Sequence, residues 1–435
     1  MALAPVPDPT SILTNAAAPA SATASGTLGT PLTGSATRVV LLGAGELGKE
    51  LAIELQRLGA EVIAVGSRDA EPAMQVAHRA HVVDLLDSDA LLNVLAIERP
   101  HIVVPESGVI EASVLGEIED GGARVVPSAL TTQLTMNREI LRRMLAEDLR
   151  LPTPKYRFAA SYPELMAAIS EIGLPAVVKP VRSSAGAGHS VVRSEADGQQ
   201  AWQMAVNGGW FSSDDDADLE PRVIVEEYVP FDAELVVFVV RARAADGGEQ
   251  AVVCPLIQAD DDGGFASAWQ PANVTPEVAA KAEALAARAI AGLPGLGVFA
   301  VELFVVGDEV LISEVTPRVV GAGFVTMASQ DFCIFSMQAR AVLGLPVSPP
   351  QLVTPAAARA LWVEGAGKPV FSRLDNALAV PGTRVFLFGK PKATRRRAVG
   401  AVLATGPDAE TARQRADQAA TSIQITLDDG RVVDS

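Results

Sequence analysis

The stretch VFAVELFVVGDEVLISEVTPR, residues 298–318, contains two apolar runs on either side of a Gly-Asp turn, a pattern typical of a β-hairpin. Each run carries one glutamate, Glu302 and Glu314. Side chains alternate between the two faces of a strand. A three-residue loop, 307–309, would therefore place the glutamates opposite each other, whereas a two-residue loop would place them on opposite faces.

Two carboxylates that face each other across paired strands repel, and a divalent cation between them would relieve that repulsion. Mg²⁺ prefers oxygen ligands and is usually held by one or two carboxylates together with substrate phosphates. The hairpin by itself fits a metal site and a pair of solvated glutamates equally well. The rest of the chain favours the metal site.

The composition indicates a multidomain α/β protein. A length of 435 residues exceeds what one core supports, and about two to four domains are expected. A net charge of −17 argues against a nucleic-acid surface but is compatible with a local nucleotide pocket. Cys254 and Cys333 lie in apolar context and are expected to be reduced core residues. No apolar run reaches the ~18 residues of a membrane-spanning helix, and the four histidines form no pair typical of a zinc site.

Composition also divides the chain into segments. Residues 1–36 are rich in Ala, Pro, Ser, Thr and Gly and lack the basic and apolar regions of a secretory signal, so we expect a disordered extension on a cytoplasmic protein. The pattern of strands and helices predicts a doubly wound domain over 37–136, a central α+β unit over 137–348 and a small β-rich domain over 349–435.

The N-terminal domain begins with a buried strand at 38–42, a glycine turn at 43–48 and a second strand at 61–65. The GxGxxG turn is a pyrophosphate-binding pattern, but an NAD site also needs an acidic residue after the second strand, where Gly66 stands. Glu46, inside the turn, would also repel a pyrophosphate. We therefore expect no NAD site.

Two glutamates are expected to meet at the carboxyl edge of this sheet. Glu46 lies in the glycine turn that follows the first strand, and Glu106 follows the strand at 101–104. Open α/β sheets bind ligands where their parallel strands end. The pair fits a site for a cationic or amino group, and two ordinary loop carboxylates are the alternative.

The central unit carries the residues of a nucleotide site. Lys179 lies in a buried strand between apolar residues, where an unpaired charge is costly, and is expected to meet an anion. The loop at 183–190 is rich in glycine and offers backbone N–H groups to phosphates. The strand at 223–229 carries two glutamates, and Glu234 lies in the next strand. The acidic run at 208–221 is expected to be a solvated excursion.

The order of these parts predicts a nucleotide–Mg²⁺ site. Lys179 and the glycine loop would hold phosphates, and the two hairpin glutamates would hold Mg²⁺. Arg318 would stabilise charge on a transferred phosphoryl group, because phosphoryl transfer depends mainly on positioning and electrostatics. Farther along, Lys390, Lys392 and residues 395–397 form a basic cluster that fits either a phosphate clamp or a solvated turn.

This order of motifs resembles the ATP-grasp superfamily and, within it, the formate-dependent phosphoribosylglycinamide formyltransferases. The likeness runs from about residue 27 to the C-terminus. It rests on the segments GAGELGKELAIELQRLGAEVIAV, AMQVAHRAHVVDLLD, LTMNRE, VVKPVRSS, AWQP, FAVELFVVGDEVLISEVTPR and LFGKP. The resemblance implies an α/β fold with an N-terminal doubly wound (Rossmann-like) domain, a central ATP-grasp α+β unit and a small C-terminal β-rich domain.

The resemblance also implies a reaction. ATP would phosphorylate formate, and the formyl phosphate would formylate the amine of glycinamide ribonucleotide in purine biosynthesis. ATP and Mg²⁺ would be the cofactors, the partners would be a small-molecule amine and a carboxylate, and the protein would be a homodimer.

The family's functional residues carry over by motif. The catalytic residues would be Lys179 and Arg318, and Mg²⁺ would be held by Glu302 and Glu314. The ATP contacts would be Arg138, Lys179, Ser184, Ala185, Gly186, Ala187, Gly188, His189, Glu226, Glu227, Tyr228, Val229 and Glu234. Glycinamide ribonucleotide would contact Glu46, Leu47 and Glu106, with its phosphate on Lys390 and Arg397.

The chain departs from the family pattern at four positions. Ala187 replaces a lysine of the glycine loop, and Gln258 lies in the segment IQAD where the family has GHRQ. Gly321 stands where an aspartate would contact the glycinamide, and Ala398 replaces the second of two arginines. The ATP half is therefore nearly intact, and the acceptor half is changed.

Two interpretations remain open: the formate-dependent transformylase itself, and a paralogous ATP-grasp ligase that joins another carboxylate or amine by the same acyl-phosphate chemistry. The segment TPRVVGAG, residues 316–323, resembles the Arg…Gly-Gly stretch of ATP-grasp amino-acid ligases and fits the second. A non-catalytic nucleotide-binding protein is disfavoured, because Lys179, Glu302 and Glu314 are all present.

Overall fold

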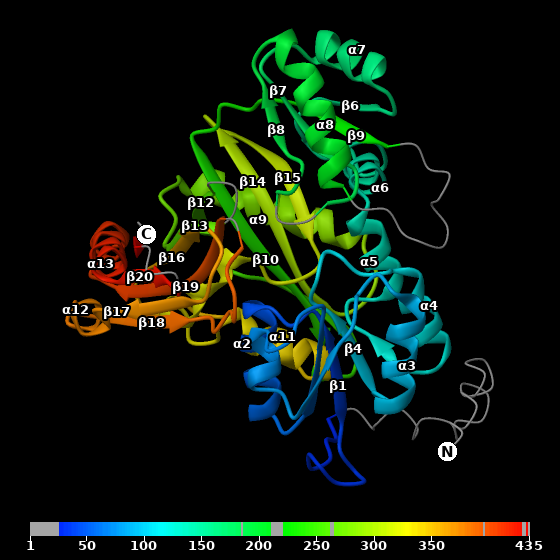
Figure 1. Cartoon of the computed structure of the whole chain (residues 1–435), viewed down its shortest axis with the longest axis vertical. Helices are drawn as coiled ribbons and strands as arrows, with labels where there is room; N and C mark the ends of the chain where they lie inside the picture. The colour runs from blue at the N-terminus through cyan, green and yellow to red at the C-terminus, as the bar shows by residue number, and fades with distance from the viewer. Residues whose placement is uncertain are drawn as a thin grey trace.

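The computed structural model describes residues 26–183, 186–209, 221–261, 265–394, 396–428 and 432–433. The described residues form four sheets: a parallel sheet near the N-terminus, a small antiparallel sheet, one long antiparallel sheet that continues into the C-terminal segment, and a three-stranded sheet near the C-terminus. The parallel sheet and the small sheet lie toward opposite ends of the molecule's long axis, and the long sheet lies between them (Figure 1). The predicted α/β fold class is confirmed.

The N-terminal sheet has the strand order β3-β2-β1-β4-β5, and every pairing in it is parallel. Its strands are β1 (Arg38–Leu42), β2 (Glu61–Gly66), β3 (Arg79–Val82), β4 (Ile102–Pro105) and β5 (Arg124–Val125). The helices that connect them are α2 (Glu46–Arg57), the 3-10 helix η1 (Pro72–Gln75), α3 (Ser88–Glu98) and α4 (Ser113–Asp120). This is the doubly wound domain that the sequence predicted.

The register of β1 and β4 brings the two predicted ligand-binding loops together. Leu42 pairs with Pro105, and the N–H of Glu106 donates to the Leu42 carbonyl at 2.8 Å. Gly43 has φ +122°, and a Cβ built on it would lie 2.7 Å from the carbonyl carbon of Glu106. Only glycine fits that position, because the backbone conformation and the close approach both exclude a side chain.

Helices link this domain to the small sheet. They are α5 (Ala129–Met136), α6 (Arg138–Arg143) and a π-helical turn, η2 (Met144–Asp148). The small sheet has the order β6-β9-β7-β8 and is antiparallel. Its elements are β6 (Tyr156–Ala159), α7 (Tyr162–Ile172), β7 (Ala176–Pro180), β8 (Ser190–Val192), the 3-10 helix η3 (Glu195–Asp197), α8 (Gly198–Gly208) and β9 (Val223–Glu227).

The long sheet has the order β15-β14-β10-β12-β13-β16-β19-β18, with β11 also paired to β10. Its strands are β10 (Ala233–Arg243), β11 (Glu249–Val253), β12 (Ile257–Asp261), β13 (Phe265–Gln270), β14 (Gly297–Val306), β15 (Glu309–Thr316), β16 (Ala356–Glu364), β18 (Thr383–Leu387) and β19 (Arg396–Thr405). The pairing of β13 with β16 makes the C-terminal strands a continuation of the same sheet.

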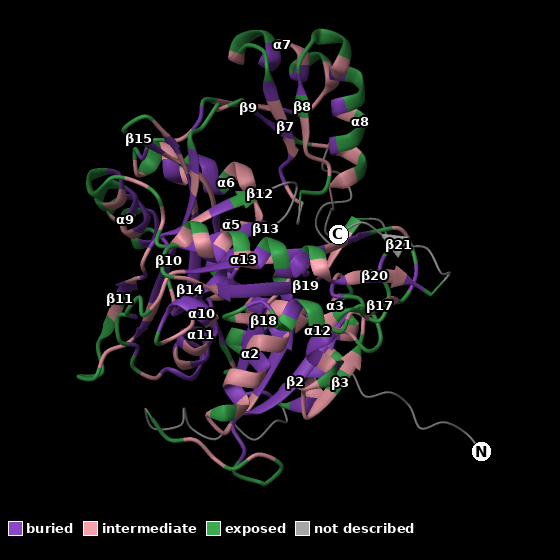
Figure 2. Ribbon diagram, turned by 90° about the vertical axis from the view of Figure 1, so that its left-hand side faces the viewer, coloured by how far each residue is buried: buried purple, intermediate pink, exposed green. Residues whose placement is uncertain are grey.

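Helices cover both faces of this sheet. They are α9 (Pro276–Ala291), the 3-10 helix η4 (Gly321–Val325), α10 (Thr326–Ser329), α11 (Ile334–Leu343), α12 (Leu374–Leu378) and α13 (Ala409–Ser422). Strands β17 (Pro369–Ser372), β20 (Gln424–Leu427) and β21 (Val432–Val433) form a separate small sheet. Alternate residues of β10 enter two different cores, one shared with α9 and one with η4 and α11. The central strands are accordingly buried on both faces (Figure 2).

The structure decides the length of the hairpin loop, which the sequence left open. Val306 pairs with Glu309, so the loop contains two residues, Gly307 and Asp308. Glu302 nevertheless pairs with Glu314, because a β-bulge next to Glu302 shifts the register by one residue. An inserted residue reverses the face to which all later side chains point. The bulge therefore places Glu302 and Glu314 on the same face of the hairpin, although a two-residue loop alone would have placed them on opposite faces.

Parts of the predicted segments lie outside the described residues. Strand β12 extends to Asp261, and residues 262–264 lie outside the described residues. Most of the predicted acidic excursion, 210–220, also lies outside the described residues, as do residues 1–25 of the predicted extension. Across the described ranges, no helix is both long and apolar enough to span a bilayer.

Candidate active site

A cavity of ≈ 340 Å³ lies where the small sheet faces the end of the β14–β15 hairpin. The residues that line it come from α5, α6, β7, the glycine loop, β10 and both strands of the hairpin. Its charged and titratable lining residues are Arg138, Lys179, His189, Glu234, Glu302, Glu314 and Arg318. The structure therefore brings together in one cavity seven of the residues that the sequence had grouped into a nucleotide site.

Lys179 meets its anion within the protein. Its Nζ lies 2.6 Å from Oε2 of Glu226, and Arg142 forms an ion pair with the other oxygen of the same carboxylate. Glu226 is only 4% exposed. Burial alone would raise the pKa of Glu226, but Lys179 and Arg142 overcome this effect and lower the pKa to about 2. The cluster keeps a net positive charge beside the cavity, which suits a phosphate ligand.

Arg138 connects the glycine loop to the hairpin. Its Nη1 donates to Oγ of Ser183 at 2.9 Å and to the Pro180 carbonyl at 3.2 Å. Its Nη2 donates to Oε1 of Glu314 at 3.2 Å. Burial would raise the pKa of Glu314, and the positive charges of Arg138 and Lys179 lower it instead. Glu314 is thus held as a carboxylate, the form in which it can bind a metal ion.

The donor set fits Mg²⁺. Glu302 and Glu314 lie directly opposite each other on paired strands and both line the cavity. No group of three or more His, Cys, Asp or Glu side chains suitable for a metal ion occurs among the described residues. Two carboxylates that leave the other positions to water and substrate phosphates are a common arrangement for Mg²⁺.

The glycine loop is described from Gly186 onward; Ser184 and Ala185 lie outside the described residues. Gly186 and Gly188 have φ of +72° and +75°. Ala187, between them, carries only a methyl group. His189 approaches Ser183, with Nε2 3.4 Å from Oγ. Burial and the nearby charges of Arg138 and Lys179 lower the pKa of His189 to about 3, so that its ring is neutral at pH 7.

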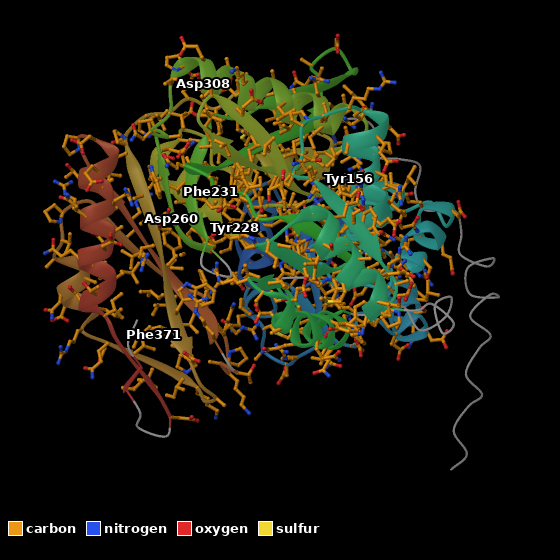
Figure 3. The ribbon with its side chains drawn as sticks, turned by 90° about the horizontal axis from the view of Figure 1, so that it is seen from above. Tyr156, Tyr228, Phe231, Asp260, Asp308 and Phe371 are labelled. Atoms are coloured by element: carbon orange, nitrogen blue, oxygen red, sulfur yellow. The ribbon has the colours of Figure 1, made fainter. Side chains whose placement is uncertain are left out.

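Residues 227–232, from the last residue of β9 to the start of β10, connect the small sheet to the long sheet, and this segment is called the seam. Glu227 accepts a hydrogen bond from the N–H of Lys155 at 2.9 Å, and the Tyr228 N–H donates to the Pro175 carbonyl at 3.3 Å. Phe231, a short distance past Val229, stacks on Phe304 with ring centroids 4.6 Å apart. Tyr228 and Phe231 lie near each other at this seam (Figure 3). Phe304 also lines the cavity, and it could not be recognised from the sequence because a phenylalanine in an apolar strand looks like ordinary core.

A second cluster lies at the carboxyl edge of the parallel sheet. Nζ of Lys390 is 2.9 Å from Oε1 of Glu46, although 344 positions separate the two residues. The Lys390 side chain is 6% exposed, and burial lowers its pKa, which Glu46 partly opposes. The charge of Arg397 acts on Lys390 and on Glu71, whose pKa is raised by burial. Glu71 could not be identified from the sequence, because nothing in its local pattern distinguishes it from a surface glutamate.

Glu106 lies near the same edge, with Arg318 as its charged neighbour. Burial raises its pKa to about 7, against the lowering effects of Arg318 and of a hydrogen bond donated by Nε2 of Gln338. Leu47 packs against the core cluster that also borders Phe265, Val320 and Ala398.

Two glycines define what the site cannot contain. A Cβ on Gly66 would lie 2.3 Å from a carboxyl oxygen of Glu71 and 2.9 Å from the Ala44 side chain, so no acidic side chain fits where NAD sites carry one. A Cβ on Gly321 would lie 2.4 Å from the Cβ of Phe265. The Phe265 ring thus fills the space that a side chain at position 321 would need.

Comparison with known proteins identifies two matching family models. The model described as "ATP-grasp domain" matches residues 144–335, and the model described as "PurT, C-terminal" matches residues 356–423. Together they cover the small sheet, the long sheet and most of the C-terminal segment.

Similar proteins extend the match to most of the chain. A protein of Burkholderia pseudomallei (strain 668), named formate-dependent phosphoribosylglycinamide formyltransferase, is 48% identical over 91% of this chain and 97% of its own length. The solved structure of glycinamide-RNase-transformylase T from Mycobacterium tuberculosis is 34% identical, with a TM-score of 0.72 over 88% of this chain and 99% of that one. An ADP complex of N5-carboxyaminoimidazole ribonucleotide synthetase is 25% identical, with a TM-score of 0.76 over 90% of this chain and 97% of that one.

Proposed function

Because the chain belongs to the family of formate-dependent phosphoribosylglycinamide formyltransferases, we propose that it is an ATP-grasp enzyme that formylates glycinamide ribonucleotide in purine biosynthesis. In the first half of the reaction, a formate oxygen attacks the γ-phosphorus of ATP, which yields formyl phosphate and ADP. In the second half, the amine attacks the formyl carbon, an amide C–N bond forms, and the C–O bond to phosphate breaks.

The residues of the cavity have roles in the first half. Lys179, Arg138 and the backbone of the glycine loop bind the triphosphate, since they supply positive charge and N–H donors at one side of the cavity. Glu302 and Glu314 would hold Mg²⁺, which would neutralise charge on the phosphates when it is bound. Arg318 lines the same cavity and stabilises charge on the transferred phosphoryl group.

The remaining ATP contacts belong to the sheet seam. The backbone from Glu226 to Val229 runs beside the adenine, and Glu234 lines the cavity where the ribose hydroxyls would lie. The cluster at the parallel sheet receives the acceptor: Glu46, Leu47 and Glu106 contact the glycinamide end, and Lys390 and Arg397 bind its phosphate. A buried lysine and an arginine in one cluster are a suitable phosphate site.

The observation that carries this proposal is that Arg318 borders both clusters. It lines the ATP cavity, and its charge acts on Glu106 at the acceptor edge. An acyl phosphate formed in the cavity would therefore be close to the amine that must attack it. We also propose that the protein is a cytoplasmic homodimer with the domain bounds 37–136, 137–348 and 349–435.

ADP release tests the proposal. Purified protein is incubated with ATP, Mg²⁺, formate and glycinamide ribonucleotide, and each component is omitted in turn. Turnover that requires all four, with the formylated product identified by mass spectrometry, is expected. Absence of turnover with this set refutes the assignment.

The second candidate function is a ligase of the same chemistry that acts on a different carboxylate or amine. The contact of Phe265 with Gly321 favours it, because an apolar ring occupies the space where the family's aspartate would reach the acceptor. A panel of amines and carboxylates in the same assay distinguishes the two. ATP binding without turnover on any pair would instead indicate a non-catalytic nucleotide-binding protein.

A further inference from the structure

Gln338 is a buried polar residue with one identified partner. It lies on α11, is 3% exposed, and donates from Nε2 to Oε1 of Glu106. Its neighbours on the helix, Met337 and Ala339, are part of the apolar cores. A buried amide among apolar side chains is costly unless it is hydrogen-bonded, so its position is explained by its contact with Glu106.

Both side chains retain an unused acceptor. Oε2 of Glu106 and Oε1 of Gln338 are shielded from solvent and have no hydrogen-bond partner among the described residues. The bond between Nε2 and Oε1 places these two acceptors on neighbouring groups. Buried acceptors without donors are unfavourable, so the pair requires N–H or O–H groups that the chain does not supply. A primary amine or its ammonium form carries such donors.

The electrostatic surroundings suit proton transfer. Arg318 is the charged side chain that acts on Glu106, Gln338 faces it from α11, and the glycine turn at Gly43 packs against its backbone. With its pKa raised by burial to about 7, Glu106 exists in both protonation states near neutral pH. A general base is most effective when its pKa lies near the working pH.

Position 321 supplies no alternative carboxylate. Gly321 follows Arg318 on the same segment, and the Phe265 ring occupies the space beside it. Along this segment, Val319 and Ala322 are buried in the apolar core and Val320 packs against it. The charges of Glu302 and Glu314 also act on Arg318, but these two are the proposed Mg²⁺ ligands, so Glu106 is the carboxylate that is suited to accept a proton from the amine.

We propose that Glu106 removes a proton from the ammonium group of the acceptor, and that Gln338 is the positioning residue that holds Glu106 for this step. The inference rests on the proposed acyl-phosphate reaction. The ammonium group gives one proton to Oε2 of Glu106 and becomes a neutral amine. The nitrogen lone pair then forms the C–N bond, the C–O bond to phosphate breaks, and the second proton leaves with the phosphate.

The test compares pH profiles of wild type and Gln338→Met, a variant of similar length without a donor. kcat/KM for glycinamide ribonucleotide is measured from pH 5.5 to 9 at saturating ATP and formate. The hydrogen bond from Gln338 lowers the pKa of Glu106, so its removal should move the acidic limb of the profile to higher pH. Turnover at pH 7 should also fall, by about tenfold, because the carboxylate loses its fixed orientation.

A separate readout follows the first half of the reaction. Formate-dependent positional isotope exchange in ATP, without the amine, reports acyl-phosphate formation alone. We expect Gln338→Met to lose more acceptor turnover than exchange. Gln338→His, which keeps a ring N–H donor, should recover part of the lost turnover. If wild type shows no formate-dependent exchange, the proposed function itself fails, and this inference fails with it.

Gln250→Met is the matched control. Gln250 donates from Nε2 to the Val347 carbonyl at 2.6 Å, away from both clusters, so its loss should leave the acidic limb in place. An unshifted limb in Gln338→Met, or equal loss of turnover and exchange, overturns the proposal. If Gln338→Met does not fold, Glu106→Gln tests the proposal instead. This variant should abolish the acidic limb of the pH profile and lower acceptor turnover by at least about 100-fold. An acidic limb that is retained in Glu106→Gln overturns the proposal.

Discussion

Replacement of Glu226 by glutamine should destabilise the protein strongly, although the substitution changes almost no volume. The carboxylate is 4% exposed and forms ion pairs with Lys179 and Arg142. Glutamine is neutral, like protonated glutamate. The shift in the pKa of Glu226 on folding therefore gives the expected loss of unfolding free energy. A pKa of about 2 against an ordinary 4.5, at about 1.4 kcal/mol per unit, corresponds to about 3 kcal/mol. Removal of one partner from a buried ion pair typically costs about 3–5 kcal/mol, which agrees.

The sign of the pH dependence follows from the depressed pKa. Glu226 contributes stability that is fully present above the unfolded-state pKa near 4.5 and is lost as the pH falls toward 2. The difference in unfolding free energy between wild type and Glu226→Gln should therefore be about 3 kcal/mol at pH 7 and roughly half of that at pH 3. Urea unfolding at the two pH values measures both quantities.

Glu171→Gln is the matched control. Glu171 pairs with Arg157 on the surface, where both side chains are more than half exposed, and exposed ion pairs contribute little. The control should unfold like the wild type at both pH values. A difference below about 1 kcal/mol for Glu226→Gln at pH 7, or a difference that does not change with pH, would refute the claim that this cluster holds a buried, compensated carboxylate. ATP should stabilise Glu226→Gln more than wild type, because its two cations are no longer neutralised.

Three further predictions concern the two halves of the site. Glu314→Gln should lower Mg²⁺-dependent turnover by at least about 100-fold with little change in Tm; undiminished turnover would remove the metal assignment. Gly321→Asp should destabilise by about 1–3 kcal/mol, because the new side chain meets the Cβ and ring of Phe265, and Phe265→Gly, which removes both, should reduce this added cost; equal urea stability of Gly321→Asp and wild type would contradict the observed contact. Lys390→Met should raise the KM for glycinamide ribonucleotide by about tenfold or more and leave the KM for ATP unchanged, as steady-state kinetics can show; an unaltered acceptor KM would argue against a phosphate site there.

The local pattern of the sequence determined most elements and the nature of the nucleotide half. Short apolar runs specify strands such as β10 and β14, and glycine turns specify where the chain reverses. Lys179, the glycine loop and the two hairpin glutamates could be grouped because each has a chemical requirement visible in its own segment. A lysine among apolar residues needs an anion, and opposed carboxylates need a cation.

Tertiary structure decided the pairings that no local pattern encodes. The contact of Glu46 with Lys390 joins positions 344 apart, and Gln338 is a plain helix residue until α11 packs beside Glu106. The partner of Lys179 in the protein is Glu226, whose side chain the sequence had placed along a nucleotide.

The hairpin shows the same division within one segment. Its glutamates, its turn and its two strands could be predicted from 298–318 alone. The facing of Glu302 and Glu314 could not, because side-chain parity depends on one inserted residue, and a β-bulge leaves no local signal when neighbouring residues are all good strand formers. The sequence determined which chemical groups the site contains, and only the packed strands determined which of them face each other.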